Sequence, residues 1–116
     1  MGFKQFTEIL AWQKARLLAK ETYVTFSGIR DYGFRDQIQK AAVSVMNNIA
    51  EGYGRRGNKE FVYFLRIAKG SCLEVQSMLY LALDLNYIDT KRFNELMLIS
   101  VHVLQLLNAL IGSLKG

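Results

Sequence analysis

The chain has 116 residues, of which 51% are hydrophobic and none is proline. This length suits a single domain covering residues 1–116 and excludes a second domain with a core of its own. Lys and Arg outnumber Asp and Glu by 15 to 10, and the resulting net charge of +5 suits an anionic partner such as nucleic acid, although many basic proteins of this size bind nothing anionic.

Cysteine usage and the first residues bear on the cellular compartment. Cys72 is the single cysteine, so no internal disulfide can form, and its place within an apolar helical pattern favours a structural thiol. Residues 1–6 lack the apolar segment of a signal peptide. We therefore expect a cytoplasmic protein.

Four segments have helical periodicity and are separated by short breaks. The expected helices run from Thr7 to Phe26, from Asp31 or Phe34 to Tyr53, from Asn58 to Leu85, and from Asp89 or Thr90 to the end of the chain. Thr7 and Asn58 are candidate N-caps, and Asn86 is a candidate left-handed terminator. Because short connections make consecutive helices antiparallel neighbours, the sequence predicts an all-α, up-and-down four-helix bundle.

Apolar stripes predict which helix faces meet in the core. The first helix has two stripes on different sides: Trp12, Ala15, Ala19 and Phe26 on one, and Leu10, Leu17 and Val24 on the other. The second stripe is either part of a wide core-facing side or a contact with another subunit. The second helix has the stripe Ile38, Ala42, Val45 and Ile49, and the third has Phe61, Leu65, Ala68, Cys72, Val75, Leu79 and Ala82.

The last helix imitates a membrane span. Residues 96–114 include no Asp, Glu, Lys or Arg over a length that could cross a bilayer. Polar side chains interrupt this stretch, and Gln105, Asn108 and Gly112 repeat on one side as they do in a soluble helix. We therefore expect no membrane partner, and a helix buried on most sides by its own bundle and by neighbouring subunits.

A line of polar residues runs along the second helix beside its apolar stripe. Its members, at spacings of seven, four, three and four, are Gln37, Ser44, Asn48, Glu51 and Arg55. Ser71 and Glu74 interrupt a second seam of the third helix that is otherwise apolar. Since a buried carboxylate needs partners, these residues predict a structural polar network that encloses Glu74 and sets the register of the two helices.

The same residues also allow a catalytic or metal-binding interpretation, in which Glu51 and Glu74 form a carboxylate pair. Carboxylate-bridged metal sites in helical bundles use Glu-x-x-His pairs, and the sequence has none. His102 is the only histidine and has no acidic residue within a helical turn. We therefore expect no metal, no cofactor and no enzymatic activity.

Positive charges gather around the break between the second and third helices. They are Arg55, Arg56, Lys59, Arg66 and Lys69. Glu51 and Glu60 are close enough in sequence to neutralise some of them, so the cluster is either a solvated, salt-bridged helix end or a contact surface for a phosphate backbone. Tyr53 and Phe61 lie nearby and either stack on bases or pack in the core.

These patterns resemble the four-helix-bundle proteins encoded in intervening sequences of bacterial 23S ribosomal RNA genes. The resemblance runs from Phe6 and the Trp12-Gln13 pair to the Asn86-Tyr87-Ile88 turn. Its most specific parts are the runs Gln37–Val45 and Asn48–Gly52, then Arg55 or Arg56, Glu60-Phe61, Phe64-Leu65, Ile67-Ala68, Gly70-Ser71 and Glu74.

The resemblance implies a cytoplasmic four-helix bundle that assembles as a ring, namely a homopentamer. It also implies a relation in fold to accessory proteins of diversity-generating retroelements, which bind nucleic acid and a reverse transcriptase. The leading hypothesis is a non-enzymatic, homo-oligomeric scaffold that binds RNA or DNA through the five basic residues. The alternative is an adaptor whose apolar surfaces recruit another protein, such as a nucleic-acid-processing enzyme, without contacting nucleic acid.

Overall fold

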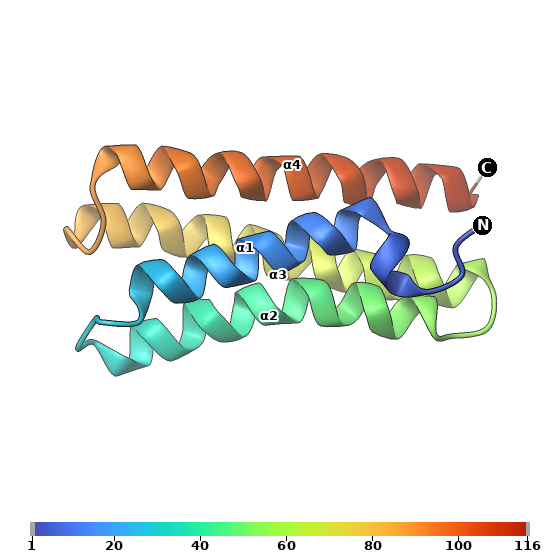
Figure 1. The fold of residues 1–116 in the computed structure, drawn as a ribbon, viewed down its shortest axis with the longest axis horizontal. Helices are drawn as coiled ribbons and strands as arrows, with labels where there is room; N and C mark the ends of the chain where they lie inside the picture. The colour runs from blue at the N-terminus through green and yellow to red at the C-terminus, as the bar shows by residue number, and fades with distance from the viewer. Residues whose placement is uncertain (1, 116) are drawn as a thin grey trace.

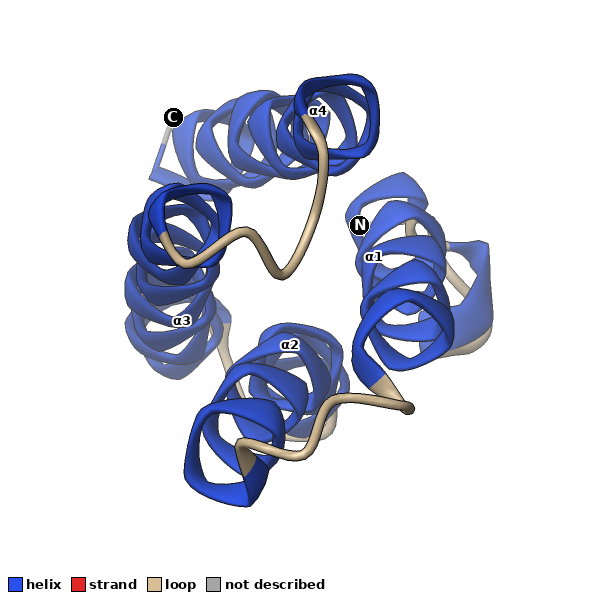
Figure 2. Cartoon of the chain, turned by 90° about the vertical axis from the view of Figure 1, so that its left-hand side faces the viewer, coloured by secondary structure: helices blue, strands red, loops and turns tan. Residues whose placement is uncertain are grey.

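The computed structural model describes residues 2–115 and has four long antiparallel α-helices (Figure 1). They are α1 (Leu10–Phe26), α2 (Tyr32–Tyr53), α3 (Asn58–Asp84) and α4 (Thr90–Lys115), and a 3-10 turn over Phe6–Glu8 precedes α1. In the end-on view the helices surround one core in chain order, so that α4 closes the ring beside α1 (Figure 2). The predicted up-and-down four-helix bundle is confirmed.

The core contains the residues that the helical stripes predict. Every member of the α2 stripe and of the first α3 stripe is buried, as are Trp12, Ala15, Ala19 and Phe26 of α1. From α4, Phe93, Leu96, Val103 and Leu107 join this core. A heptad-like spacing keeps one side of each helix inward, and burial of these apolar side chains provides the main driving force for folding.

The α1 side chains of the second stripe are turned away from this core. Leu10 and Val24 are 62% and 63% exposed, and Leu17 is half-buried. A wide core-facing side is therefore the wrong interpretation of this stripe within a single chain. The exposed stripe leaves an apolar surface on the outside of α1.

Two of the predicted helix starts differ in the structure. Ile9, and not Thr7, is the N-cap of α1, because the chain first makes the short 3-10 turn. Gly57, and not Asn58, is the N-cap of α3, with a φ of 87° that suits glycine. The Asn58 side chain instead donates a hydrogen bond to the Leu114 carbonyl oxygen over 3.3 Å, which ties the start of α3 to the end of α4.

Other helix ends are as expected. The Asp31 carboxylate accepts a hydrogen bond from the Phe34 amide at the start of α2, and Asp89 accepts one from the Arg92 amide at the start of α4. Asn86 has the left-handed φ of 60° that ends α3.

Helix α4 is long and apolar enough to cross a membrane by length and composition, with a mean hydropathy of 1.8 over its most apolar 18 residues. The chain itself buries 28% of that segment. Gln105, Asn108 and Gly112 are exposed, as the periodicity predicts. The apolar Leu98 is exposed as well, by 72%. One chain thus covers only the inward side of α4.

Candidate functional site

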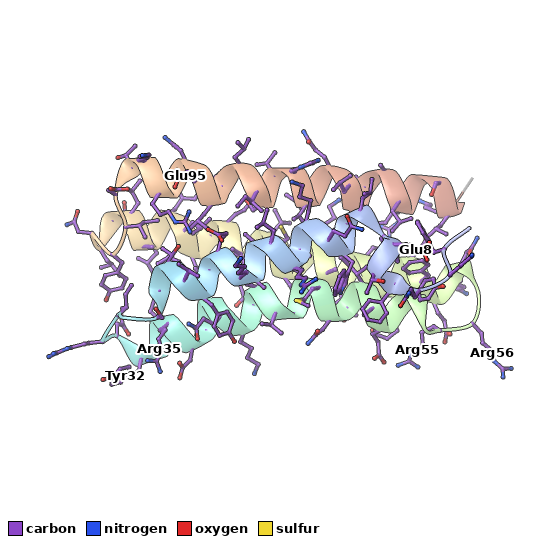
Figure 3. All side chains as sticks on the ribbon, viewed as in Figure 1. Glu8, Tyr32, Arg35, Arg55, Arg56 and Glu95 are labelled. Carbon is purple, nitrogen blue, oxygen red and sulfur yellow. The ribbon has the colours of Figure 1, made fainter. Side chains whose placement is uncertain are left out.

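The five basic residues of the cluster lie on the α2–α3 turn and the first half of α3. Arg55, Arg56, Lys59 and Arg66 are exposed, and Lys69 is half-buried. The labelled side chains of Arg55 and Arg56 project outward beside the turn, at the end of the bundle where both chain termini lie (Figure 3). The antiparallel fold thus places the turn and the chain ends together.

Two further lysines join this end of the bundle. The Tyr53 hydroxyl donates a hydrogen bond to the Phe3 carbonyl oxygen over 2.8 Å, which brings the N-terminal segment and the exposed Lys4 to the end of α2. The bond between Asn58 and Leu114 likewise brings Lys115 to the start of α3. Lys4 and Lys115 lie about 50 or more residues from the turn in sequence, so no local sequence pattern connects them with it.

Arg55 is the member of the cluster that the protein itself engages. It forms an ion pair with Glu51, one helical turn earlier, and its guanidinium lies over the Phe64 ring at 4.8 Å from the ring centre. Within residues 2–115, none of the other four cluster residues has a carboxylate oxygen within 4.0 Å. Glu51 therefore neutralises Arg55, as expected, whereas Glu60 forms no ion pair in the cluster.

The two aromatic residues considered for base stacking are occupied elsewhere. Phe61 is buried, and Tyr53 is half-buried, packs edge-on against Phe61 and donates its hydroxyl to Phe3. Tyr63 is the exposed aromatic of this region, with 62% of its surface accessible. Tyr63 belongs to no apolar stripe, so helical periodicity alone does not single it out. Its place four residues after Lys59 and three before Arg66 was the available signal.

The polar line of α2 meets Ser71 and Glu74 of α3, as predicted. Ser44 Oγ and Ser71 Oγ are 2.9 Å apart, and the Asn48 amide donates to both the carbonyl oxygen and the hydroxyl of Ser44. The Gln37 amide donates to the Glu74 carboxylate over 3.3 Å. Two separate contacts thus cross the α2–α3 seam, one at Ser44–Ser71 and one at Gln37–Glu74. Glu51, the other predicted member of the network, is exposed and pairs with Arg55 on its own helix instead.

The predicted burial of Glu74 is wrong. Both Glu74 and Gln37 are exposed, so this pair lies at the outer edge of the seam and water solvates the carboxylate. On the side of α3 that faces α4, the half-buried Gln76 donates its side-chain amide to the hydroxyl of the buried Ser100 over 3.1 Å. Two residues along α3 correspond to a rotation of about 200°, which separates the two seams.

Glu51 and Glu74 are too far apart to form the carboxylate pair of the alternative interpretation. Glu74 contacts Gln37, which precedes Glu51 by 14 residues, or about 21 Å of helix. Among residues 2–115, no group of three or more His, Cys, Asp and Glu side chains could hold a metal ion. His102 is exposed, and burial raises the pKa of the Cys72 thiol to about 12, so the thiol is protonated at neutral pH.

A pair of apolar hollows lies outside the bundle between α1 and α4. Leu10 and Leu106 line both hollows, which have volumes of about 270 and 240 Å³. Near the start of α4, the Arg92 guanidinium donates to the Glu21 carboxylate and the Thr25 hydroxyl of α1, each over 2.8 Å. Polar contacts thus join α1 and α4 near the start of α4, whereas the hollows beside Leu10 are apolar.

The fold and this site describe a small helical bundle with a basic end, an exposed apolar groove and no recognisable catalytic constellation in residues 2–115. The chain belongs to the 23S rRNA-intervening sequence protein family, whose sequence pattern matches residues 7–109. This membership agrees with the resemblance seen in the sequence.

A solved structure supports the fold. It is the crystal structure of a protein of unknown function from the S23 ribosomal protein family of Bacteroides thetaiotaomicron, with 21% sequence identity and a TM-score of 0.82. The match covers 88% of the present chain and 98% of the other. No curated protein matches the sequence.

Proposed function

We propose that the protein is a non-enzymatic, homo-oligomeric scaffold that binds RNA or DNA through the basic cluster. The observation that carries this proposal is a set of four cations at one end of the bundle, Arg56, Lys59, Arg66 and Lys69, that form no ion pair with a carboxylate of residues 2–115. Such cations release counterions from a phosphate backbone, which favours binding without strong sequence preference.

Self-association supplies the second part of the proposal. Leu10 and Val24 on α1 and Leu98 on α4 expose large apolar side chains, and Leu10 lines both hollows between these helices, as is typical of a surface that another chain covers. A closed ring would repeat the basic cluster once per copy, and we expect five copies. Weak individual contacts would then add through multivalency. The proposal places this assembly in the cytoplasm, in agreement with the single buried Cys72.

Charge reversal tests nucleic-acid binding. The variant combines Arg56→Glu, Lys59→Glu and Arg66→Glu, and its control combines Lys20→Glu, Lys40→Glu and Lys91→Glu at exposed positions elsewhere. Each set changes the net charge by six, from +5 to −1, so total charge is matched. Fluorescence anisotropy with labelled RNA and duplex DNA, at about 50 and about 200 mM salt, measures the affinity.

We expect the cluster variant to lose binding at the lower salt concentration and the control to retain most of it. Each removed phosphate contact should also reduce the slope of log affinity against log salt by about 0.7 to 0.9. Equal losses in both variants would show that net charge alone attracts the nucleic acid. Absence of binding by the unmodified protein would refute the proposal.

The adaptor function is the second candidate, and the two apolar hollows favour it. Leu10→Glu combined with Val24→Glu places charges on this surface without touching the core. Under the leading proposal, sedimentation should show a smaller assembly. If assembly is unchanged but a protein captured from nuclease-treated lysate is lost, the groove serves as an adaptor surface.

A further inference from the structure

The outer face of α3 has an aromatic side chain between two cations. Lys59, Tyr63, Arg66 and Gly70 follow one another at spacings of four, three and four, which places them on one side of the helix. All four are exposed, whereas Phe61, Leu65 and Ala68 point into the core from the opposite side. The core does not account for the position of Tyr63.

The Tyr63 ring is supported from one side. It packs edge-on against Phe64, with 5.3 Å between ring centres and an angle of 87° between ring planes. The Arg55 guanidinium in turn covers the Phe64 ring at 4.8 Å. Edge-on packing restrains the Tyr63 ring while most of its surface stays accessible. A supported, exposed ring beside positive charge is what an unpaired base stacks on.

Gly70 extends this face by one helical turn. Glycine in a helix interior lowers stability relative to alanine, yet a Cβ atom at position 70 would have no neighbour within 4 Å. The fold of one chain therefore gives no reason for glycine there. A missing side chain does allow a sugar–phosphate backbone to approach the helix closely.

We propose that this α3 face binds single-stranded nucleic acid, with an unpaired base stacked on Tyr63 and phosphates held by Lys59 and Arg66. The inference rests on the proposed nucleic-acid function and specifies its ligand. In duplex nucleic acid the base faces are stacked on one another, so the Tyr63 ring cannot reach them. Single strands should therefore bind more tightly than duplexes of the same sequence.

Tyr80 is a matched control for Tyr63. It is also on α3, is 59% exposed and packs edge-on against a phenylalanine, Phe93, with ring centres 5.1 Å apart. The helix positions around Tyr80 hold Gln76, Ser77 and Asp84, with no cation within four residues on either side. Tyr63→Ala and Tyr80→Ala thus remove equivalent rings that differ in electrostatic surroundings.

The experiment measures binding of a labelled single strand of about 12 nucleotides by anisotropy. The same strand annealed to its complement, and an abasic strand with the same phosphates, are the comparison ligands. We expect Tyr63→Ala to weaken binding of the intact single strand roughly 5- to 150-fold, because one stacked base is lost. Tyr63→Phe and Tyr80→Ala should bind the intact strand as tightly as the unmodified protein does. For the abasic strand, Tyr63→Ala and the unmodified protein should have the same affinity.

Gly70→Leu tests the path of the backbone, with Ser77→Leu as the control at another exposed α3 position. We expect Gly70→Leu alone to weaken single-strand binding, with helical content unchanged by circular dichroism. Sedimentation of each variant reports assembly. A smaller assembly with unchanged binding would show that this face contacts another copy and would overturn the inference.

Two further outcomes separate this inference from the proposed function. If cluster charge reversal abolishes binding but Tyr63→Ala binds normally, the single-strand inference fails and the nucleic-acid function stands. If Tyr63→Ala weakens binding of duplex, abasic and intact strands equally, stacking is excluded. Absence of binding to every probe refutes both.

Discussion

The two halves of α3 have the same interior and different exteriors. In the first half, Asn58–Ser71, the outward residues include three cations and one carboxylate, and in the second half, Cys72–Asp84, they include two carboxylates and no cation. Both halves nevertheless place fully buried side chains in the core at heptad-like spacing, such as Leu65 and Leu79. Folding thus constrains one side of the helix, and the opposite side is free to differ in charge.

Equal core truncations should have the largest effect on stability and should affect both halves alike. Leu65→Ala and Leu79→Ala each remove a fully buried side chain, at a cost of about 2–5 kcal/mol. Chemical denaturation measures the change in unfolding free energy. A cost below about 1 kcal/mol for one of the two variants would contradict the claim that both halves of α3 are equally well packed in the core.

Gly52→Ala tests how closely the first half of α3 approaches α2. A Cβ atom at position 52 would lie 2.7 Å from Phe64 Cβ and 3.0 Å from Phe61 Cδ1. Because Phe64 Cβ is fixed to the backbone, the helices must move apart, at a cost of about 1–3 kcal/mol. The structure buries Gly52 within α2, where it acts as a packing residue.

Gly70→Ala is the matched substitution on the open side of the same half. No neighbour obstructs a Cβ atom there, so alanine should raise the unfolding free energy by about 0.5–1 kcal/mol. Denaturation midpoints of the two variants should shift in opposite directions. A shift in the same direction would contradict the close approach at Gly52.

Cys72 lies at the junction of the two halves and should make stability depend on pH. Burial raises its pKa to about 12 in the folded protein, whereas an unfolded thiol titrates near 8.5. Its contribution is therefore complete below about pH 8.5 and decreases as pH rises toward 12, by about 1.4 kcal/mol per unit. Denaturation of the unmodified protein and of Cys72→Ala between about pH 8 and pH 10 measures this difference. Parallel pH profiles would contradict the burial of the thiol.

The smallest effects distinguish two polar contacts of the α2–α3 seam. Ser71→Ala removes the half-buried partner of the Ser44 hydroxyl and should cost about 0.5–1.5 kcal/mol. Glu74→Ala should cost less than about 0.5 kcal/mol, since water already solvates the carboxylate. Denaturation of both variants measures the order, and a larger loss for Glu74→Ala would indicate that another chain covers this edge.

The aromatic residues near the α2–α3 turn differ in how far the sequence predicts their burial. Phe61 belongs to an unbroken heptad stripe, so its burial follows from helical period alone. Tyr53 and Tyr63 both lie outside the stripes, so the stripes do not predict which of them is exposed. The N-terminal segment contacts Tyr53 through Phe3 and leaves Tyr63 accessible. That contact joins residues 50 positions apart, and no local pattern encodes it.

The sequence by itself determined the four helices, their antiparallel order, the inward stripes and the gathering of five cations near one turn, because these depend on spacing along the helix and on short connections. Only the tertiary structure decided that Glu74 is solvated, that Gln76 contacts the buried Ser100, and that Tyr63 is the accessible aromatic of the basic end. The physical reason is that coverage of a residue at the margin of a stripe depends on the distance and rotation of the neighbouring helix, which packing of the whole core sets.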